Sequence, residues 1–247
     1  MGLLDVFKRQ KKEAADLGGT LLVDIHSHLL PGIDDGAPTM DHTIGMLRKF
    51  EELGYQKLVF TPHVMSGVYD NTTEIILGKL EEVRKVSSEL GLKLRLEASA
   101  EYYFDETFFE RIRTKDLLPF HGNHILFEFS FRNEPSRVEE VVFQLRSAGY
   151  QPILAHFERY LYYHPSIEVA QQLREHGCLI QVNLNSFTGH YGPEVKKQAL
   201  RLLKAGVIDL LGSDCHRIQH LELLENSLQD PIFYQLLKEQ VQNRLFL

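Results

Sequence analysis

The feature that most constrains the fold is a regular alternation of short apolar runs with longer segments of helical period. The apolar runs have the length and the β-branched content of buried strands. They lie at 21–25, 57–61, 94–99, 124–129, 151–155, 178–183 and 207–212. Helical periodicity covers 39–53, 73–90, 137–148, 167–176 and 193–205, and several of these segments end in glycine. Such a repeat predicts a series of parallel βα units.

The polar residues of these units favour a closed or distorted (β/α) barrel over an open, doubly wound sheet. No glycine-rich dinucleotide fingerprint follows the first strand, and polar residues recur where strands end, as they do at barrel sites. We therefore predict one α/β domain over 21–247, closed by helices within 221–245. An amphipathic leader over 1–20 precedes it, and we expect a frayed segment rather than one that docks on a membrane or a partner.

The overall composition excludes several classes of protein. A net charge of -7 argues against nucleic-acid binding, because no basic face is available to neutralise phosphates. No apolar run approaches the length of a membrane span, so we expect no integral membrane protein. Two cysteines, Cys178 and Cys215, make no disulfide framework, which favours a reducing compartment. We predict a cytoplasmic protein, with the leader as the one candidate for peripheral contact with the inner membrane face.

Ionisable side chains follow the predicted strands at the same end of each. His26 and His28 are one residue apart, so on an extended strand they face the same way, roughly 7 Å apart along the chain. The later strands end in His63, Glu101, Glu128, His156, Asp214 and His216, and the loop after the first strand holds Asp34 and Asp35. Because the carboxyl ends of parallel strands meet at one end of a barrel, we expect these groups to converge.

Converging ionisable groups predict a metal centre. One such residue alone has an ordinary explanation, such as an edge position for Glu128 or a helix N-cap for Asp214. Several together need compensating charge when they are buried, and divalent ions supply it. Imidazole and carboxylate without thiolate suit manganese, zinc or iron. The candidate ligands exceed what one ion needs, so we predict two or three ions that share a bridging carboxylate.

In this order the motifs resemble the PHP (polymerase and histidinol phosphatase) family. They are His26-Ser-His28, Thr61-Pro-His63, the strand-end Glu101 and Glu128, Ala155-His156-x-Glu158-Arg159-Tyr160 and Ser213-Asp214-x-His216. Asp34-Asp35-Gly36, Gly67-Val68-Tyr69 and the Glu-Arg-Tyr element resemble its capsule-type tyrosine-protein phosphatase branch. The likeness spans residues 21–216. It implies a distorted (β/α)7 barrel, which agrees with the number of predicted strands.

The resemblance implies three metal positions. The first would be held by His26, His28, Glu101 and Asp214; the second by Glu101, Glu128 and His156; and the third by Asp35, His63 and His216. Asp35 is preferred to Asp34, and manganese is favoured over iron or zinc.

The resemblance also implies how the substrate phosphate is bound. Arg159 matches a phosphate-binding arginine, a role that suits the planar donor fork of its guanidinium. The second arginine of this branch, in a proline-containing loop after the Asp-x-His motif, has no counterpart here. Either Arg217 or His220 takes its place, or the affinity for phosphate is weaker.

The implied reaction is hydrolysis of a phosphomonoester, with protein phosphotyrosine as the favoured substrate. Metal-bound hydroxide would attack phosphorus while the ions and Arg159 stabilise the phosphoryl charge. The leaving phenolate would take its proton from His63 or His216, if either is free of metal, or from metal-bound water, and the sequence leaves these sources open. A cysteine nucleophile is excluded, because no arginine stands six residues after either cysteine. A membrane tyrosine kinase of capsular or exopolysaccharide biosynthesis is the implied partner.

Two alternatives stay open. A small-molecule phosphatase of the histidinol-phosphatase type would share the metal chemistry and differ only at the mouth of the barrel. Residues 64–73 and 102–109 are expected to line that mouth, although the aromatic residues of the second segment fit a core-facing helix stripe equally well. A catalytically silent barrel that docks a partner kinase would show degenerate ligands, whereas the matched ligands here are intact.

Overall fold

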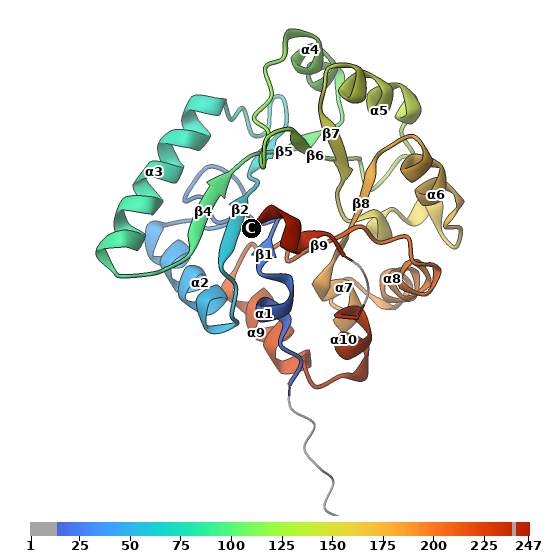
Figure 1. The fold of residues 1–247 in the computed structure, drawn as a ribbon. Coiled ribbons are helices and arrows are strands. Elements are labelled where there is room, and N and C mark those ends of the chain that lie inside the picture. The colour runs from blue at the N-terminus through green and yellow to red at the C-terminus, as the bar shows by residue number, and fades with distance from the viewer. Residues whose placement is uncertain (1–13, 239–240) are drawn as a thin grey trace, which may run out of the picture.

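The computed structural model describes residues 14–238 and 241–247, which form a ring of parallel strands surrounded by helices (Figure 1). The strands are β1 Val23–Asp24, β2 Lys57–Phe60, β3 His63–Val64, β4 Arg95–Ala98, β5 Glu101–Tyr103, β6 His124–Glu128, β7 Gln151–Leu154, β8 Leu179–Asn183 and β9 Leu210–Gly212. β3 continues the line of β2, and β5 continues the line of β4. The described strands therefore fall on seven lines, as the sequence predicts.

The strands follow one another around the ring in chain order. One sheet has the order β1-β2-β4 and the other β3-β5-β6-β7-β8-β9, and every strand pair is parallel. The two sheets meet where the lines of β2 and β4 are interrupted. There Ser99 N donates to Phe60 O at 2.8 Å, and Glu101 N donates to Pro62 O at 3.0 Å. The interruptions thus re-aim the chain just before His63 and Glu101.

The ring closes at a seam between β1 and β9. Asp214 N donates to His26 O at 2.8 Å, and His28 N donates to Cys215 O at 2.9 Å. Further along the seam, the side-chain amide of Asn243 donates to Val23 O at 3.0 Å and to Leu211 O at 2.7 Å. The first and last strands are therefore joined partly by backbone and partly by a buried side chain. The predicted α/β barrel is confirmed.

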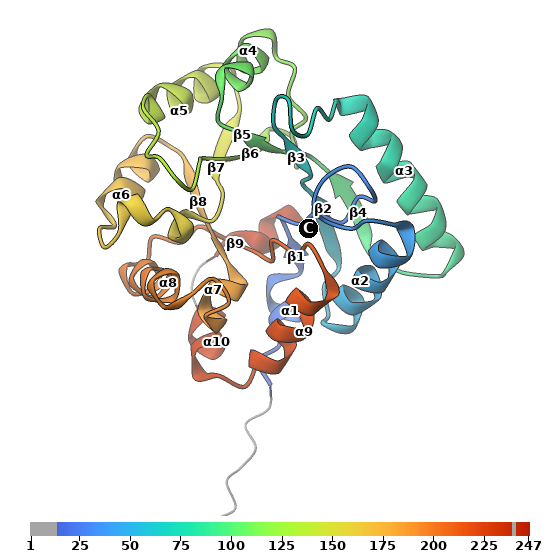
Figure 2. The ribbon, with the colours of Figure 1, turned by 180° about the vertical axis from the view of Figure 1, so that it is seen from behind.

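Helices cover the outside of the ring (Figures 1 and 2). They are α1 Leu17–Leu21, α2 Met40–Glu52, α3 Thr73–Glu89, α4 Glu106–Thr114, α5 Val138–Ser147, α6 Glu168–Glu175, α7 Leu184–Thr188, α8 Pro193–Ala205, α9 Ile218–Ser227 and α10 Pro231–Leu236, with 3-10 helices η1 Phe157–Arg159, η2 Leu161–Tyr163 and η3 Asn243–Phe246. The C-terminal η3 lies at the middle of the ring, where buried Phe246 packs in one cluster with Val23, Val59 and Leu210. The chain end thereby fills the inside of the barrel.

The start of the chain differs from the prediction. A strand was expected over 21–25, but residues 17–21 form α1, and β1 covers Val23–Asp24. Leu17 and Leu21 lie one helical turn apart, and both are buried against the barrel. Ala15, which falls within the predicted leader, is also buried and donates its backbone N–H to Leu228 O at 2.9 Å. Residues 1–13 of the leader lie outside the described residues, and the division into leader and barrel stays a prediction.

Two short helices, α4 and α7, have no counterpart in the predicted elements. α4 follows Asp105, whose carboxylate caps it at Phe108 N at 2.8 Å. Only Phe108 and Ile112 of α4 are buried, so the helical period is too short to recognise in the sequence. Tyr102 and Phe108 stack at 5.4 Å within the core. The aromatic residues of 102–109 thus include core residues, which supports the alternative of a core-facing stripe.

The expected closing segment is divided rather than continuous. Instead of one helical segment over 221–245, the chain forms α9, α10 and η3. Among the described residues, no helix combines the length and apolar character that a membrane crossing requires.

Candidate metal centre

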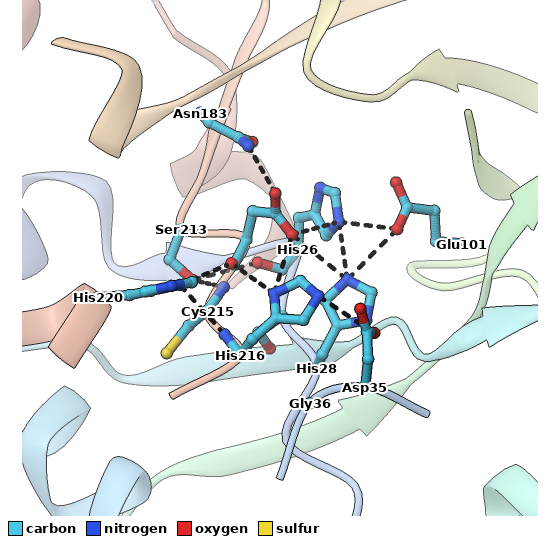
Figure 3. A network of polar contacts seen from close by, with 12 residues as sticks. His26, His28, Asp35, Gly36, Glu101, Asn183, Ser213, Cys215, His216 and His220 are labelled. Atoms are coloured by element: carbon cyan, nitrogen blue, oxygen red, sulfur yellow. Dashed lines mark hydrogen bonds and ion pairs between the residues drawn. The ribbon is translucent and has the colours of Figure 1, made fainter. Parts of the chain in front are cut away.

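The ionisable residues predicted from the strand ends do converge. One cavity of about 240 Å³ opens over them at the carboxyl ends of the strands. Its lining comprises Asp35, His63, Glu101, Glu128, Phe131, His156, Arg159, His190, Tyr191, Asp214, His216, Arg217 and His220. His26 and His28 are fully buried beside them, with their Nε2 atoms 3.2 Å apart. Figure 3 shows these imidazoles turned toward Glu101.

Glu101 stands at the centre of the cluster. Its Oε2 lies 3.2 Å from His26 Nε2, 3.3 Å from His28 Nε2 and 3.3 Å from His63 Nδ1. Its Oε1 lies 2.9 Å from His156 Nε2. Although three ring nitrogens surround Oε2, this buried atom accepts no hydrogen bond from any described residue. A buried acceptor without a donor is costly, so it calls for an explanation.

A bound cation provides that explanation, and the spacing of the donor atoms fits it. Two ligand atoms at about 2.1 Å from one ion lie about 3.0–3.4 Å apart in octahedral or tetrahedral geometry. The nitrogen–oxygen distances around Glu101 fall in this range. Asp214 adds a second carboxylate, whose Oδ1 lies 3.5 Å from His26 Nε2 and 3.4 Å from His28 Nε2. The residues present thus fit divalent ions.

The charges in the cluster favour cations as well. Burial alone would lower the pKa of His26, but the carboxylates of Glu101 and Asp214 outweigh it and raise this pKa to about 9. Burial would raise the pKa of Glu101, yet the nearby His26 and His63 hold it well below its usual range. The carboxylates therefore attract positive charge to the cavity, whether protons or metal ions carry it.

Four overlapping groups of residues place their ligand atoms within 4.8 Å of one another. These groups are His28, Asp35, His63 and His216; His26, His28 and Asp214; His26, Glu101 and His156; and His63, Glu101 and Glu128. His156 Nε2 also lies 3.7 Å from Glu128 Oε2. The structure thus brings together the members of each implied set, and it adds His28 to the set of Asp35, His63 and His216.

The two aspartates of the first loop have different surroundings. Asp34 is turned inward, where its Oδ2 lies 2.8 Å from His28 Nδ1 and accepts the backbone N–H of His63 at 3.2 Å. Asp35 is half-exposed, and its Oδ1 lies 3.5 Å from His63 Nε2 and 3.4 Å from His216 Nε2. Asp35 therefore faces the cavity, whereas Asp34 holds the His28 ring in place from behind.

Two candidate ligands sit on strained backbone. His156 has φ of 33° and Asp214 has φ of 49°, both in the left-handed region that non-glycine residues rarely adopt. Each is the second residue after the end of its strand, where the turn directs its side chain into the cavity. Strain of this kind is retained where surrounding contacts enforce it, and it is often found at functional sites.

Arg159 is fixed beside the cluster by three contacts. Its Nη1 donates to Asp214 Oδ2 at 2.9 Å. Its Cζ lies 4.3 Å from the ring centre of Phe131 and 4.5 Å from that of Tyr191, which are cation–π distances. The guanidinium therefore lines the cavity between two aromatic side chains.

Both residues expected to replace the missing family arginine lie at the cavity. Arg217 is exposed, precedes α9, and donates from Nε to His220 Nε2 at 3.1 Å. Burial and the nearby His216 lower the pKa of His220 to about 4, so at neutral pH this ring is an uncharged acceptor. Of the two, Arg217 thus provides the cationic group at the rim.

Several residues of the site were not predicted from the sequence. Gln181 lies in β8, and its Oε1 contacts His26 Nδ1 at 3.0 Å and accepts from His156 N at 2.9 Å. Its polar side chain in the middle of an apolar strand was a usable signal. Phe131 and Tyr191 lie in irregular segments without periodicity, and no comparable signal marks them in the sequence.

The cysteines stand apart from the cavity. Cys215 is buried between two of the candidate ligands in sequence, yet its Sγ lies 3.6 Å from Met46 Sδ in the core. It faces away from the ligands, as predicted for the middle residue of an alternating strand end.

The comparisons with known proteins agree with this geometry. A family model described as capsular polysaccharide synthesis, CpsB/CapC, matches residues 22–224. The chain therefore belongs to the CpsB/CapC family.

Individual relatives point the same way. The chain is 29% identical to tyrosine-protein phosphatase YwqE of Bacillus subtilis over 199 residues, 80% of this chain and 78% of that one. It is 25% identical to tyrosine-protein phosphatase CpsB of Streptococcus pneumoniae over 203 residues, 80% of this chain and 84% of that one. A crystal structure from work on YwqE and CpsB, described as metal-dependent tyrosine phosphatases, superposes with a TM-score of 0.75 at 28% identity and covers 86% of this chain and 90% of that chain.

Proposed function

We propose that this protein is a metal-dependent protein-tyrosine phosphatase. The observation that carries the proposal is a single cavity in which a cluster of imidazoles and carboxylates adjoins an arginine held between aromatic rings. The names of its relatives support the same reaction.

The proposed ligands are those that the resemblance implied: His26, His28, Asp35, His63, Glu101, Glu128, His156, Asp214 and His216. Their distances support two or three ions, with Glu101 shared between positions because its two oxygens face different imidazoles. Manganese is the proposed metal, with iron or zinc as alternatives, because the donor set mixes imidazole with carboxylate and includes no thiolate. When bound, such ions activate water for attack and neutralise charge on the phosphoryl oxygens.

The protein's own side chains supply the remaining parts of the proposed mechanism. Arg159 is placed to bind phosphoryl oxygens with a planar donor fork, and its contact with Asp214 sets its direction. Arg217 adds a second positive charge at the rim. His63 or His216 is proposed to donate a proton to the leaving phenolate where its ring is not bound to metal; their side chains are 16% and 18% exposed, whereas those of His26 and His28 are 0% exposed. Their greater exposure supports this role, because a proton donor must reach the leaving group.

The aromatic residues beside Arg159 favour an aryl phosphate. Phe131 is 41% exposed at the cavity, with its ring 5.2 Å from that of His156. The Phe131 ring can stack against the phenyl group of an aryl phosphate, whereas an alkyl phosphate has no ring to stack on it. A small-molecule phosphatase of the histidinol-phosphatase type is not favoured by the relatives, which are named tyrosine-protein phosphatases. A silent docking barrel is not favoured either, because the ligand atoms converge.

The proposed protein substrate is a membrane tyrosine kinase of capsular or exopolysaccharide biosynthesis, met at the cytoplasmic face of the membrane. Its support is the family's description as capsular polysaccharide synthesis. The basic leader that would touch a membrane lies outside the described residues.

The test is hydrolysis by metal-stripped protein to which manganese, zinc, iron, cobalt and magnesium are returned singly. We expect turnover of p-nitrophenyl phosphate and a phosphotyrosine peptide only with metal, and far less turnover of histidinol phosphate. If the protein hydrolyses small phosphoesters but not the phosphotyrosine peptide, the small-molecule phosphatase becomes the favoured function. No turnover with any metal would favour the docking barrel.

A further inference from the structure

A second hollow opens directly beside the catalytic cavity. It has a volume of about 610 Å³ and lies between the start of α2 and the start of α9. Its lining includes Pro38, Gly45 and Met46 on one side and Arg217 and Ile218 on the other. We call it the α2–α9 groove. Its volume is in the range of pockets that hold ligands.

The α2–α9 groove is continuous with the cavity. Asp35, His216 and Arg217 line both of them. Asp35 and His216 are also candidate metal ligands, so the groove begins where the substrate phosphate is expected to be bound. A substrate that ends within the cavity has no atoms to place in the groove, whereas a polypeptide has chain on both sides of its phosphotyrosine.

We propose that the α2–α9 groove binds the segment of polypeptide that flanks the substrate phosphotyrosine. This inference rests on the proposed function and adds to it the surface that selects a protein over a free phosphoester.

The chemistry of the groove suits a peptide of varied sequence. Pro38 and Ile218 give the groove apolar surface, and Met46 lies buried beneath it. The rim carries charges of both signs, with Asp41 on α2 and Arg217 at α9. An apolar floor with a mixed rim favours side chains and backbone of an extended peptide over a ligand of one charge.

Gly45 gives a direct way to close the groove. It lies inside α2, is exposed, and lines the groove, and a Cβ built on it would meet nothing within 4 Å. A larger side chain at this position would therefore occupy the groove without displacing the fold.

Gly78 is the matched control. It lies inside α3, is exposed, and also has nothing within 4 Å of an added Cβ. It lines neither the cavity nor the groove. Both positions are helix interiors, where leucine has a higher propensity than glycine, so each substitution is expected to raise Tm.

The experiment compares Gly45→Leu with Gly78→Leu in the metal-loaded protein. We measure kcat/KM for a phosphotyrosine peptide with several residues on each side and for p-nitrophenyl phosphate. Gly45→Leu is expected to lower the ratio of peptide to p-nitrophenyl phosphate by about tenfold, mainly through KM, because a contact made by substrate and transition state alike is lost. Gly78→Leu is expected to leave the ratio unchanged.

Other outcomes overturn the inference. An unchanged ratio in Gly45→Leu shows that the peptide does not use the groove. An altered oligomeric state in size-exclusion chromatography with an unchanged ratio assigns the groove to a second copy of the chain. Binding of the same phosphotyrosine peptide, followed by fluorescence anisotropy in all three proteins, tests the groove without turnover. If the wild-type protein binds the peptide but does not hydrolyse it, the proposed function fails, while equal binding by Gly45→Leu refutes the groove.

Discussion

Two buried carboxylates at opposite ends of the barrel, Asp209 and Glu101, have opposite surroundings. Asp209 lies just before β9, at the amino-terminal end of the strands. Arg174 Nε donates to its Oδ2 at 3.0 Å, Arg174 Nη2 donates to its Oδ1 at 3.0 Å, and Ile180 N donates to Oδ2 at 2.9 Å. Each oxygen of Asp209 thus accepts a hydrogen bond within the protein, and the Arg174 guanidinium balances the negative charge of the carboxylate.

Glu101 lies at the carboxyl-terminal end, where the surroundings are incomplete. Its Oε2 accepts no hydrogen bond from the described residues while three imidazoles crowd it. A satisfied buried pair holds the fold together, whereas a crowded and unsatisfied group indicates a ligand that the protein alone does not supply. Both carboxylates are buried, so burial does not distinguish them. What distinguishes the structural carboxylate from the candidate ligand is whether each of its oxygens accepts a hydrogen bond from the protein.

The largest expected effect is that of Glu101→Gln. The amide keeps the shape of the side chain but removes the charge that the cations need, so metal content and turnover should fall together. Changes to residues behind a ligand already cost about 10–100-fold, so loss of a shared ligand should cost at least about 100-fold in kcat. Activity assays with metal analysis by mass spectrometry measure both.

Glu97→Gln is the control for this change. Glu97 lies on β4, on the same line of the barrel, but it pairs with Lys57 at 2.7 Å, away from the cavity. We expect it to retain metal and turnover. Normal metal content in Glu101→Gln would show that the unsatisfied oxygen does not mark a ligand.

Asp209→Asn should lower the free energy of unfolding and leave turnover by the folded protein unchanged. The change leaves the Arg174 guanidinium without its charged partner, and loss of one member of a buried pair costs several kcal/mol. Because the Arg174 side chain is 37% exposed, water replaces part of the interaction, so we expect a loss of about 2 kcal/mol in the free energy of unfolding. Urea denaturation measures this loss.

The matched control is Glu194→Gln, which removes an exposed pair with Lys197 at 2.6 Å and should leave stability nearly unchanged. Turnover per folded molecule should be equal in both variants and the wild type. If the Asp209→Asn protein were stable but inactive, Asp209 would have a role in activity and not the stabilising role assigned to it here.

The smallest expected effect comes from the thiols, one at each end of the barrel. Cys178 and Cys215 are both buried, and burial raises the pKa of the Cys178 thiol. Neither is expected to react with iodoacetamide in the folded protein, so turnover should be unchanged after treatment. Intact-mass spectrometry should show no adduct in the native state and two in urea. Inactivation by one adduct would place a thiol in the mechanism.

Much of the fold and the ligand cluster could be predicted because the same physical pattern recurs. Ionisable residues follow the strands β1, β2, β4, β7 and β9 within a few residues, and one ends β6, while parallel topology brings these strand ends together. His26 and His28 converge for the reason given by strand alternation, with an Nε2–Nε2 distance of 3.2 Å.

The features that escaped prediction depend on tertiary contacts. The preference for Asp35 over Asp34 as a ligand came from the family resemblance, since no local pattern separates the two residues; Asp34 turns inward because its Oδ2 contacts His28 Nδ1 and His63 N. The stacking of Phe131 on Arg159 joins a loop to η1, and no periodicity in the sequence indicates that contact. The helix at 17–21 precedes the expected strand and shortens it to Val23–Asp24, because Leu17 and Leu21 pack on the barrel, and local propensity alone does not indicate a burial partner.

The seam between β1 and β9 has a consequence for how the protein is made. His26 and His28 emerge early from the ribosome, whereas Asp214, which bonds to His26 across the seam, emerges only with the last strand. Asn243, which joins Val23 to Leu211, follows later still. A nascent or truncated chain that stops before β9 holds most of the imidazoles without the closed ring that orients them. We therefore expect a chain that stops before β9 to lack the proposed activity.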